Sequence, residues 1–157
     1  MADEQKERSD LILQGATATW EMNIDGNVNG TYRGTFKFKC YLTPTETLAA
    51  GRAYRELLGA NPAFAPDHES FLAYALTQLK YRVLEAPPFW TTSKEGPFNG
   101  DLADENVISE VLLAATDAEI KYKAQLNQRK KDALERAIKA AEKINSSTTE
   151  EPDESTT

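Results

Sequence analysis

The 157-residue sequence is poor in the side chains that most often carry chemistry, since it holds one cysteine, Cys40, and one histidine, His68. A single cysteine excludes an intrachain disulfide and a cysteine-based zinc site. A single histidine, placed where a helix is expected to begin, leaves no second imidazole for a metal and little material for a serine–histidine–acid triad. We therefore expect no catalytic residues, no metal, no cofactor and no enzymatic activity.

Acidic and glycine-containing segments have ordinary structural explanations. Asp101, Asp104 and Glu105 gather where a helix is expected to begin. Their oxygen atoms suit calcium or magnesium, but the spacing does not match a calcium loop, and helix N-termini favour acids in any case. The loops Asp25-Gly26-Asn27 and Asn29-Gly30 lack both the spacing and the lysine of a phosphate-binding loop. These patterns therefore indicate structure rather than a site.

Long apolar runs are also missing from the chain. No segment approaches the roughly 20 apolar residues that cross a bilayer. The charged N-terminus, MADEQKERSD, is not followed by the apolar stretch of a secretory signal. We therefore expect no membrane partner and a cytoplasmic location.

Charge is spread unevenly along the chain. The net charge of −7 divides into −8 for residues 1–120 (10 basic, 18 acidic), +5 for residues 121–143 (8 basic, 3 acidic) and −4 for the last fourteen residues. A globally acidic body disfavours nucleic acid as a partner, because phosphates must be met by clustered Lys and Arg. The basic segment has three interpretations, namely a solvated helix, a helix that pairs with another protein, or an arm that touches nucleic acid.

Residues 1–15 are expected to form a flexible arm, with room for a short turn of helix at Ser9–Gln14. A period of two then predicts two strands that form an antiparallel hairpin with one buried face. The inward positions are Ala18, Trp20, Met22 and Ile24 on the first strand and Tyr32, Phe36, Phe38, Cys40 and Leu42 on the second. Asp25-Gly26-Asn27 predicts the turn, with Gly26 at positive φ, and a longer loop reaching Asn29-Gly30 is the alternative. The hairpin must pack on the helices or join strands of another copy, because a lone ribbon is marginal in water.

Two helices are expected to follow the hairpin. Thr43-Pro44-Thr45-Glu46 has the pattern of a capping box, which predicts a helix from there to Leu58 with Gly59 as its left-handed stop. Asp67 is expected to cap the second helix, and the double proline at 87 and 88 ends it. Its buried stripe is predicted at Leu72, Ala75, Leu76, Leu79 and Val83, widened by Phe71, Tyr74 and Tyr81.

A third, long helix is predicted to start at a cap formed by Asp101 or Asp104. The apolar positions of its first half are Val107, Ile108, Val111, Leu112, Ala115 and Ala118. Beyond Ile120 only a thin stripe remains, which is too narrow to hold down a core helix. The expected organisation is an α+β domain over 16–120, a charged helical extension over 121–145 and a disordered acidic tail over 146–157. The fold class is thus an N-terminal antiparallel β-hairpin packed on a three-helix α domain, with a long protruding C-terminal helix.

Phe89 and Trp90 follow the double proline and form the most specific local pattern in the chain. They either fold back on the helices as core or stay exposed in an interface, where such residues are over-represented. Phe98 lies in the loop that comes next. Together with the stripe of the long helix, these aromatics give the candidate partner-binding residues Phe89, Trp90, Phe98, Leu126, Leu134 and Ile138.

Residues 31–120 resemble small proteins from the structural gene clusters of tailed bacteriophages, and above all tail-assembly chaperones. The segments that carry the resemblance are TYRGTFKFKCYL, TPTETLAAGRAYRELLG and HESFLAYALTQLKYRVLEAPPFW, in this order. The matching features are the helix start at Thr43–Glu46, the Leu-Leu-Gly close at Leu57–Gly59 and the aromatic close at Ala86–Trp90.

The resemblance implies a non-enzymatic role, in which the protein shields a long helical tail component during assembly and associates with itself. Its partners would then be other phage structural proteins, in the cytoplasm of a bacterial host. One alternative is a stoichiometric virion component, such as a minor tail, neck or capsid-associated protein. A second alternative is a nucleic-acid-associated accessory protein that uses Lys121 to Lys143. A small enzyme with an unfamiliar site ranks last, since it needs a pocket that a sequence does not display.

Overall fold

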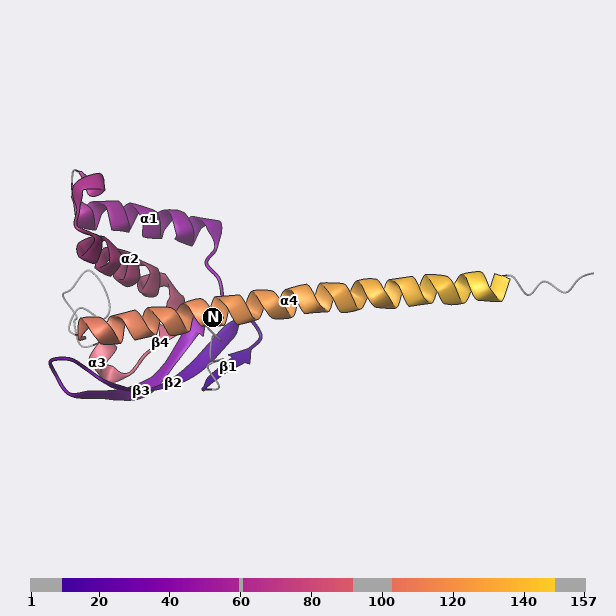
Figure 1. Ribbon diagram of the computed structural model, residues 1–157, viewed down its shortest axis with the longest axis horizontal. Coiled ribbons are helices and arrows are strands. Elements are labelled where there is room, and N and C mark those ends of the chain that lie inside the picture. Colours follow the sequence, from indigo (N-terminus) through magenta and orange to yellow (C-terminus); the bar gives the residue numbers. More distant parts are fainter. Residues whose placement is uncertain (1–9, 60, 92–102, 149–157) are drawn as a thin grey trace, which may run out of the picture. The chain divides into compact units, whose positions relative to one another are not determined.

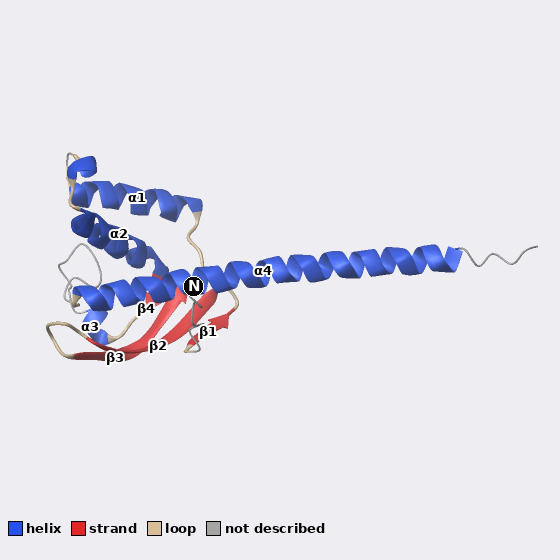
Figure 2. Ribbon diagram, in the orientation of Figure 1, coloured by secondary structure: helices blue, strands red, loops and turns tan. Residues whose placement is uncertain are grey.

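The computed structural model describes residues 10–59, 61–91 and 103–148, which form an α+β fold with one antiparallel sheet (Figure 2). The chain divides after Tyr122 into two compact units. The elements are β1 (Leu11–Gln14), β2 (Thr17–Asp25), β3 (Thr31–Lys39), α1 (Pro44–Leu58), the 3-10 turn η1 (Pro62–Phe64), α2 (Asp67–Arg82), β4 (Val83–Glu85), α3 (Pro88–Thr91) and α4 (Glu105–Thr148).

The predicted hairpin is confirmed as β2 and β3, which pair antiparallel in the register Trp20↔Phe36 and Asp25↔Thr31. The longer loop is the correct alternative, since the Gly26 N–H donates to the Gly30 carbonyl oxygen at 2.7 Å. The positive φ falls at Gly30, with a value of 85°, and not at Gly26. Glycine suits this position because the left-handed region is costly for residues with a Cβ.

The sheet has four strands in the order β1-β2-β3-β4, two more than the sequence predicts. Residues 11–14 are β1 and neither arm nor helical turn, because Leu11 pairs with Trp20 and is buried. Val83 is likewise not the end of α2, since it pairs with Phe38 in β4. Both added strands are short edge strands, and their pairing partners rather than their own pattern determine their conformation.

The core of the first unit joins one face of the sheet to α2, α3 and the first half of α4. Figure 1 shows this part of α4 between the sheet and the α1–α2 pair. Its buried members include Trp20, Phe36 and Phe38 from the sheet, Ala75 and Leu79 from α2, Trp90 from α3, and Val107, Val111, Ala115 and Ala118 from α4. The predicted apolar faces of β2, β3 and the first half of α4 are therefore confirmed.

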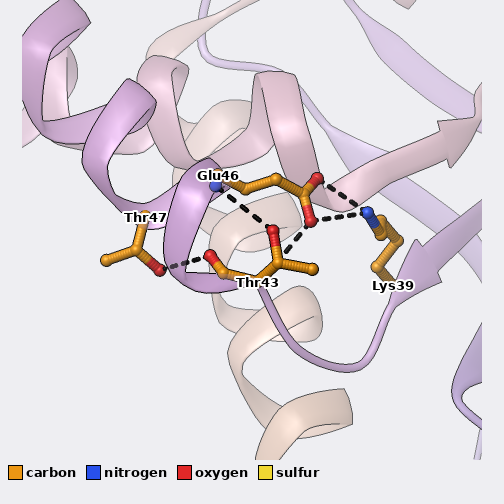
Figure 3. Close-up of polar contacts among 4 residues, drawn as sticks. All are labelled: Lys39, Thr43, Glu46 and Thr47. Atoms are coloured by element: carbon orange, nitrogen blue, oxygen red, sulfur yellow. Dashed lines mark hydrogen bonds and ion pairs between the residues drawn. The ribbon is translucent and has the colours of Figure 1, made fainter.

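The capping box at the start of α1 is confirmed in full (Figure 3). The Glu46 N–H donates to Thr43 Oγ1 at 3.2 Å, and the Thr43 N–H donates to Glu46 Oε1 at 3.1 Å. Lys39 Nζ, at the end of β3, adds an ion pair to the Glu46 carboxylate at 2.7 Å. The Lys39 hydrogen bond is the main cause that lowers the pKa of Glu46, followed by the Thr43 backbone. The box thus ties the start of α1 to the end of β3.

The other helix ends match the sequence less closely. Gly59 ends α1 at a positive φ of 78°, as predicted, but its ψ of −159° lies outside the left-handed helical region. Asp67 is the first residue of α2 and not its cap, because Pro66 occupies the cap position without a side-chain hydrogen bond. The double proline does not end α2, because the helix already stops at Arg82 and β4 comes between. Pro88 instead opens the short helix α3, since proline suits a first helical position.

α4 confirms the long C-terminal helix, with 44 residues from Glu105 to Thr148. It continues three residues past the predicted boundary at 145. The helical part of the first unit thus holds α1, α2 and the first half of α4, with α3 as an unforeseen short fourth helix. Residues 149–157, where most of the disordered tail is predicted, lie outside the described residues.

Candidate interaction surfaces

The aromatic pair after the double proline packs on the core. Trp90 is 1% exposed, and its ring meets Phe36 edge-on with centroids 5.3 Å apart. Phe89 is half-buried and meets Tyr32 edge-on at 4.8 Å. The core alternative is therefore correct for Trp90, and its inclusion among the partner-binding residues is wrong, because a buried ring cannot reach a partner. Phe98 lies outside the described residues.

The remaining sequence candidates lie on the second half of α4. Leu126 is half-buried, while Leu134 is 62% exposed and Ile138 is 49% exposed. All other side chains between 133 and 146 are exposed as well. The apolar stripe of this segment is thus open to solvent along its length.

Four exposed apolar side chains lie near the connection between α1 and α2, and we call this set the helix-pair tip: Leu57, Phe64, Phe71 and Tyr74. Leu57 lies in the last turn of α1, Phe64 in η1, and the other two in the first half of α2. α1 and α2 pack together. All four residues lie in the connection between these helices or within about two helical turns of it. Phe64 is 86% exposed, and Phe71 and Tyr74 are exposed rather than part of the buried α2 stripe.

Periodic patterns do not reveal the helix-pair tip, because Phe64 belongs to no periodic segment. A usable signal does exist in the sequence, since Phe64 lies between Pro62 and Pro66. A short connection with two prolines is confined to the surface, because its backbone groups need water or local partners. A large aromatic in such a connection is therefore expected to be exposed.

The loop between β2 and β3 is fastened to the start of α4 by Asp104, the residue before Glu105, and we call this contact the loop latch. Asp104 Oδ2 accepts hydrogen bonds from the Val28 and Asn29 N–H groups at 2.9 and 2.8 Å, and Oδ1 accepts one from Asn29 Nδ2. The Asn27 N–H donates to Asn106 Oδ1 at 3.1 Å. The backbone hydrogen bond from Asn29 is the main cause that lowers the pKa of Asp104, and the bond from Val28 adds to it.

The loop latch also borders a shallow hollow beside the start of α4, lined by Asn27, Asn29, Asp104 and Asn106 among others. Both oxygen atoms of the Asp104 carboxylate are already engaged by the loop. A Cβ added at Gly26 would collide with that carboxylate, so the loop and the helix are in close contact. The arrangement is structural, since its polar groups bind one another.

The titratable groups elsewhere also form structural pairs. The buried Arg82 donates from Nη2 to Glu119 Oε2 at 3.2 Å, which ties the end of α2 to α4. Burial raises the pKa of the Cys40 thiol, and the charge of Glu119 adds to the effect. The predicted buried thiol is therefore confirmed. His68 is exposed, with its Nε2 3.1 Å from Glu105 Oε2.

The described part of the chain holds neither a metal cluster nor a membrane-spanning helix. Within residues 10–59, 61–91 and 103–148, no group of three His, Cys, Asp or Glu side chains could hold a metal ion. None of the described helices is apolar over enough residues to span a bilayer.

Comparison with known proteins adds no assignment. No protein-family model matches the chain, and no match to it was found among curated proteins or solved structures. The helix-pair tip and the second half of α4 are therefore the basis for a functional proposal.

Proposed function

We propose that this protein is a non-enzymatic interaction protein that binds an apolar helical segment of a protein partner through the helix-pair tip. The observation that carries the proposal is the exposure of Phe64, at 86%, together with that of Leu57, Phe71 and Tyr74. Large apolar side chains that gather on a surface mark interaction sites, and aromatic residues supply much of the binding energy there.

The frame around the helix-pair tip suits it for binding. α1 is held at its start by the capping box of Thr43 and at its end by Gly59. The Phe64 N–H donates to the Asn61 carbonyl oxygen at 3.1 Å, which closes the turn that carries the ring. A surface that is already ordered loses less conformational entropy on binding, so more of the contact energy appears as affinity.

The biological role we propose is that of a tail-assembly chaperone, which shields a long helical tail component in the cytoplasm of a bacterial host. The resemblance of residues 31–120 to that group supports this role, as does the match between an exposed aromatic surface and the apolar face of a helix. Arg82 is paired with Glu119, and Asp104 is bound by the loop between β2 and β3. These structural roles of charged groups support the non-enzymatic part of the proposal.

The test compares Phe64→Ala with Val28→Ala, a matched change at another exposed apolar residue (81% exposed). The tagged full-length variants are expressed in cells that produce the chain naturally, and the captured proteins are identified by mass spectrometry. We expect a long helical protein to be captured by the wild type and by Val28→Ala. Capture by Phe64→Ala should fall about thirtyfold, equivalent to about 2 kcal/mol for an aromatic hot spot.

Unchanged thermal unfolding of both variants is the control for folding, because each side chain is exposed. Equal capture by Phe64→Ala and the wild type would refute the helix-pair tip as the binding surface. Capture of the same protein only in finished particles would refute the assembly role.

A further inference from the structure

The second half of α4 carries an exposed apolar stripe with the spacing of a pairing helix. We define the α4 stripe as Leu134, Ala137, Ile138 and Ala141, all of them exposed. Their spacings of three and four residues place them on one face of the helix. Leu134, Ile138 and Ala141 are separated by four and then three residues, which is the alternation of a helix that pairs along a seam.

Charged side chains of opposite sign flank this seam on its two sides. Glu135 and Glu142 each follow a seam residue directly, so they lie along one edge of the stripe. Lys130 lies four residues before Leu134, on the other edge. These are the flanking positions whose long side chains form ion pairs between paired helices and set their orientation.

The orientation of a second, identical helix decides which charges meet. In a parallel pair, the edge with Lys130 lies beside the partner's edge with Glu135, about five residues further along, and the two-fold symmetry makes this contact twice. In an antiparallel pair, like edges meet, so Glu135 of one copy approaches Glu142 of the other. We therefore propose that the α4 stripe is the surface through which two copies of this chain associate, with their helices parallel.

The charge balance of the segment agrees with a second copy as the occupant. Residues 121–143 carry a net charge of +5, which opposes self-pairing of the whole segment. The excess lies before the stripe, since residues 132–143 hold three basic and three acidic side chains and are neutral. Lys131 is in line with the seam and would face its own copy in a parallel pair, so we expect the tight contact to begin after it.

This proposal does not depend on the proposed function, because it uses a different surface. Phe64→Ala is expected to leave the self-association unchanged, and disruption of the α4 stripe is expected to leave the folding of the first unit unchanged. The two proposals can therefore fail separately.

Orientation is tested by disulfides between copies, in full-length protein with Cys40→Ala as the background. Leu134→Cys and Ala141→Cys each place a thiol in the seam, and Lys143→Cys places one on the opposite face as a control. In a parallel pair both seam thiols meet their own copies, so each variant should give a covalent dimer under mild oxidation. In an antiparallel pair, only the position at the centre of the contact faces the same position of the other copy. Cross-linking at only one seam position, or equal cross-linking by Lys143→Cys, would overturn the parallel arrangement.

The flanking charges are tested by the dissociation constant for self-association, measured by analytical ultracentrifugation. Lys130→Glu replaces two attractions by two repulsions in a parallel pair and should raise the dissociation constant about tenfold. The double variant Lys130→Glu with Glu135→Lys restores the opposite charges and should return the constant to near the wild-type value. Lys139→Glu, away from the seam, is the matched control for net charge and should have little effect.

A double variant that associates no better than Lys130→Glu alone would refute the parallel contact between Lys130 and Glu135. A wild-type protein that stays monomeric at its highest soluble concentration would refute the association as a whole.

Discussion

The apolar positions predicted for the first half of α4, from Val107 to Ala118, are buried in the core, whereas every side chain from Ala133 to Ser146 on the same helix is exposed. Both stretches keep the apolar spacing of an amphipathic helix. The first stretch offers Val, Ile and Leu and meets a sheet, while the apolar side chains of the second are mostly alanine. Periodicity thus predicts a helix in both halves, but burial also needs large side chains and a facing surface.

The largest expected effect comes from placing the same charge on each half. Val111→Asp puts an unpaired carboxylate into the core, where Val111 is fully buried. It should lower the free energy of unfolding by about 4 kcal/mol or more, as buried unpaired charges do. Ile138→Asp should change the stability of the first unit by less than about 0.5 kcal/mol, since surface changes are mostly small.

Urea unfolding followed by tryptophan fluorescence measures both variants, because Trp20 and Trp90 lie in the core of the first unit. Equal losses of stability for Val111→Asp and Ile138→Asp would contradict the conclusion that only the first half of α4 is part of the core.

Much of the fold could be predicted from the sequence because its signals are local. The capping box at Thr43, the stop at Gly59 and the alternation of β2 and β3 each depend on residues close together in the chain. The edge strands β1 and β4 could not be predicted, since each has too few residues to show a period. Only pairing with a neighbouring strand makes them strands.

The interaction surfaces also include some features that local sequence patterns predict and others that only the fold determines. The exposure of Leu134 and Ile138 could be predicted because the stripe around them is thin. The sequence pattern around Trp90 fits an interface as well as a core, and only the fold brings its ring to Phe36. The exposure of Phe64 follows from the path of a connection and not from a period, so pattern alone does not predict it.

A smaller effect is expected from adding a methyl group at two glycines, Gly34 in a closely packed contact and Gly51 in α1, where there is more space. A Cβ added at Gly34 would overlap the ring of Pro87, which is rigid and cannot move aside easily. Gly34→Ala should therefore lower the free energy of unfolding by about 2 kcal/mol. Gly51→Ala, in α1, is the matched control, because the nearest atom to its Cβ is Arg55 Nη1 at 3.5 Å. That change should raise stability by about 0.5–1 kcal/mol, and a stabilising Gly34→Ala would contradict the close contact.

The smallest expected effect concerns the pH dependence of the loop latch at the start of α4. Hydrogen bonds from the loop lower the pKa of Asp104, so the folded state favours its ionised form. The resulting stability is present above the ordinary carboxyl pKa of about 4 and is lost as the pH falls through the lower value in the folded protein. Asp104→Asn should therefore unfold at a lower temperature than the wild type at neutral pH, with the difference shrinking in acid.

The control for this measurement is Glu135→Gln, which changes an exposed carboxylate in the second half of α4. The unfolding temperature of the first unit in this variant should equal that of the wild type at every pH. The contrast arises because Asp104 is held by backbone N–H groups of a distant loop, whereas Glu135 lies on the exposed half of the helix. A constant difference between Asp104→Asn and the wild type across the pH range would show that the loop latch acts through shape and not through the charge of Asp104.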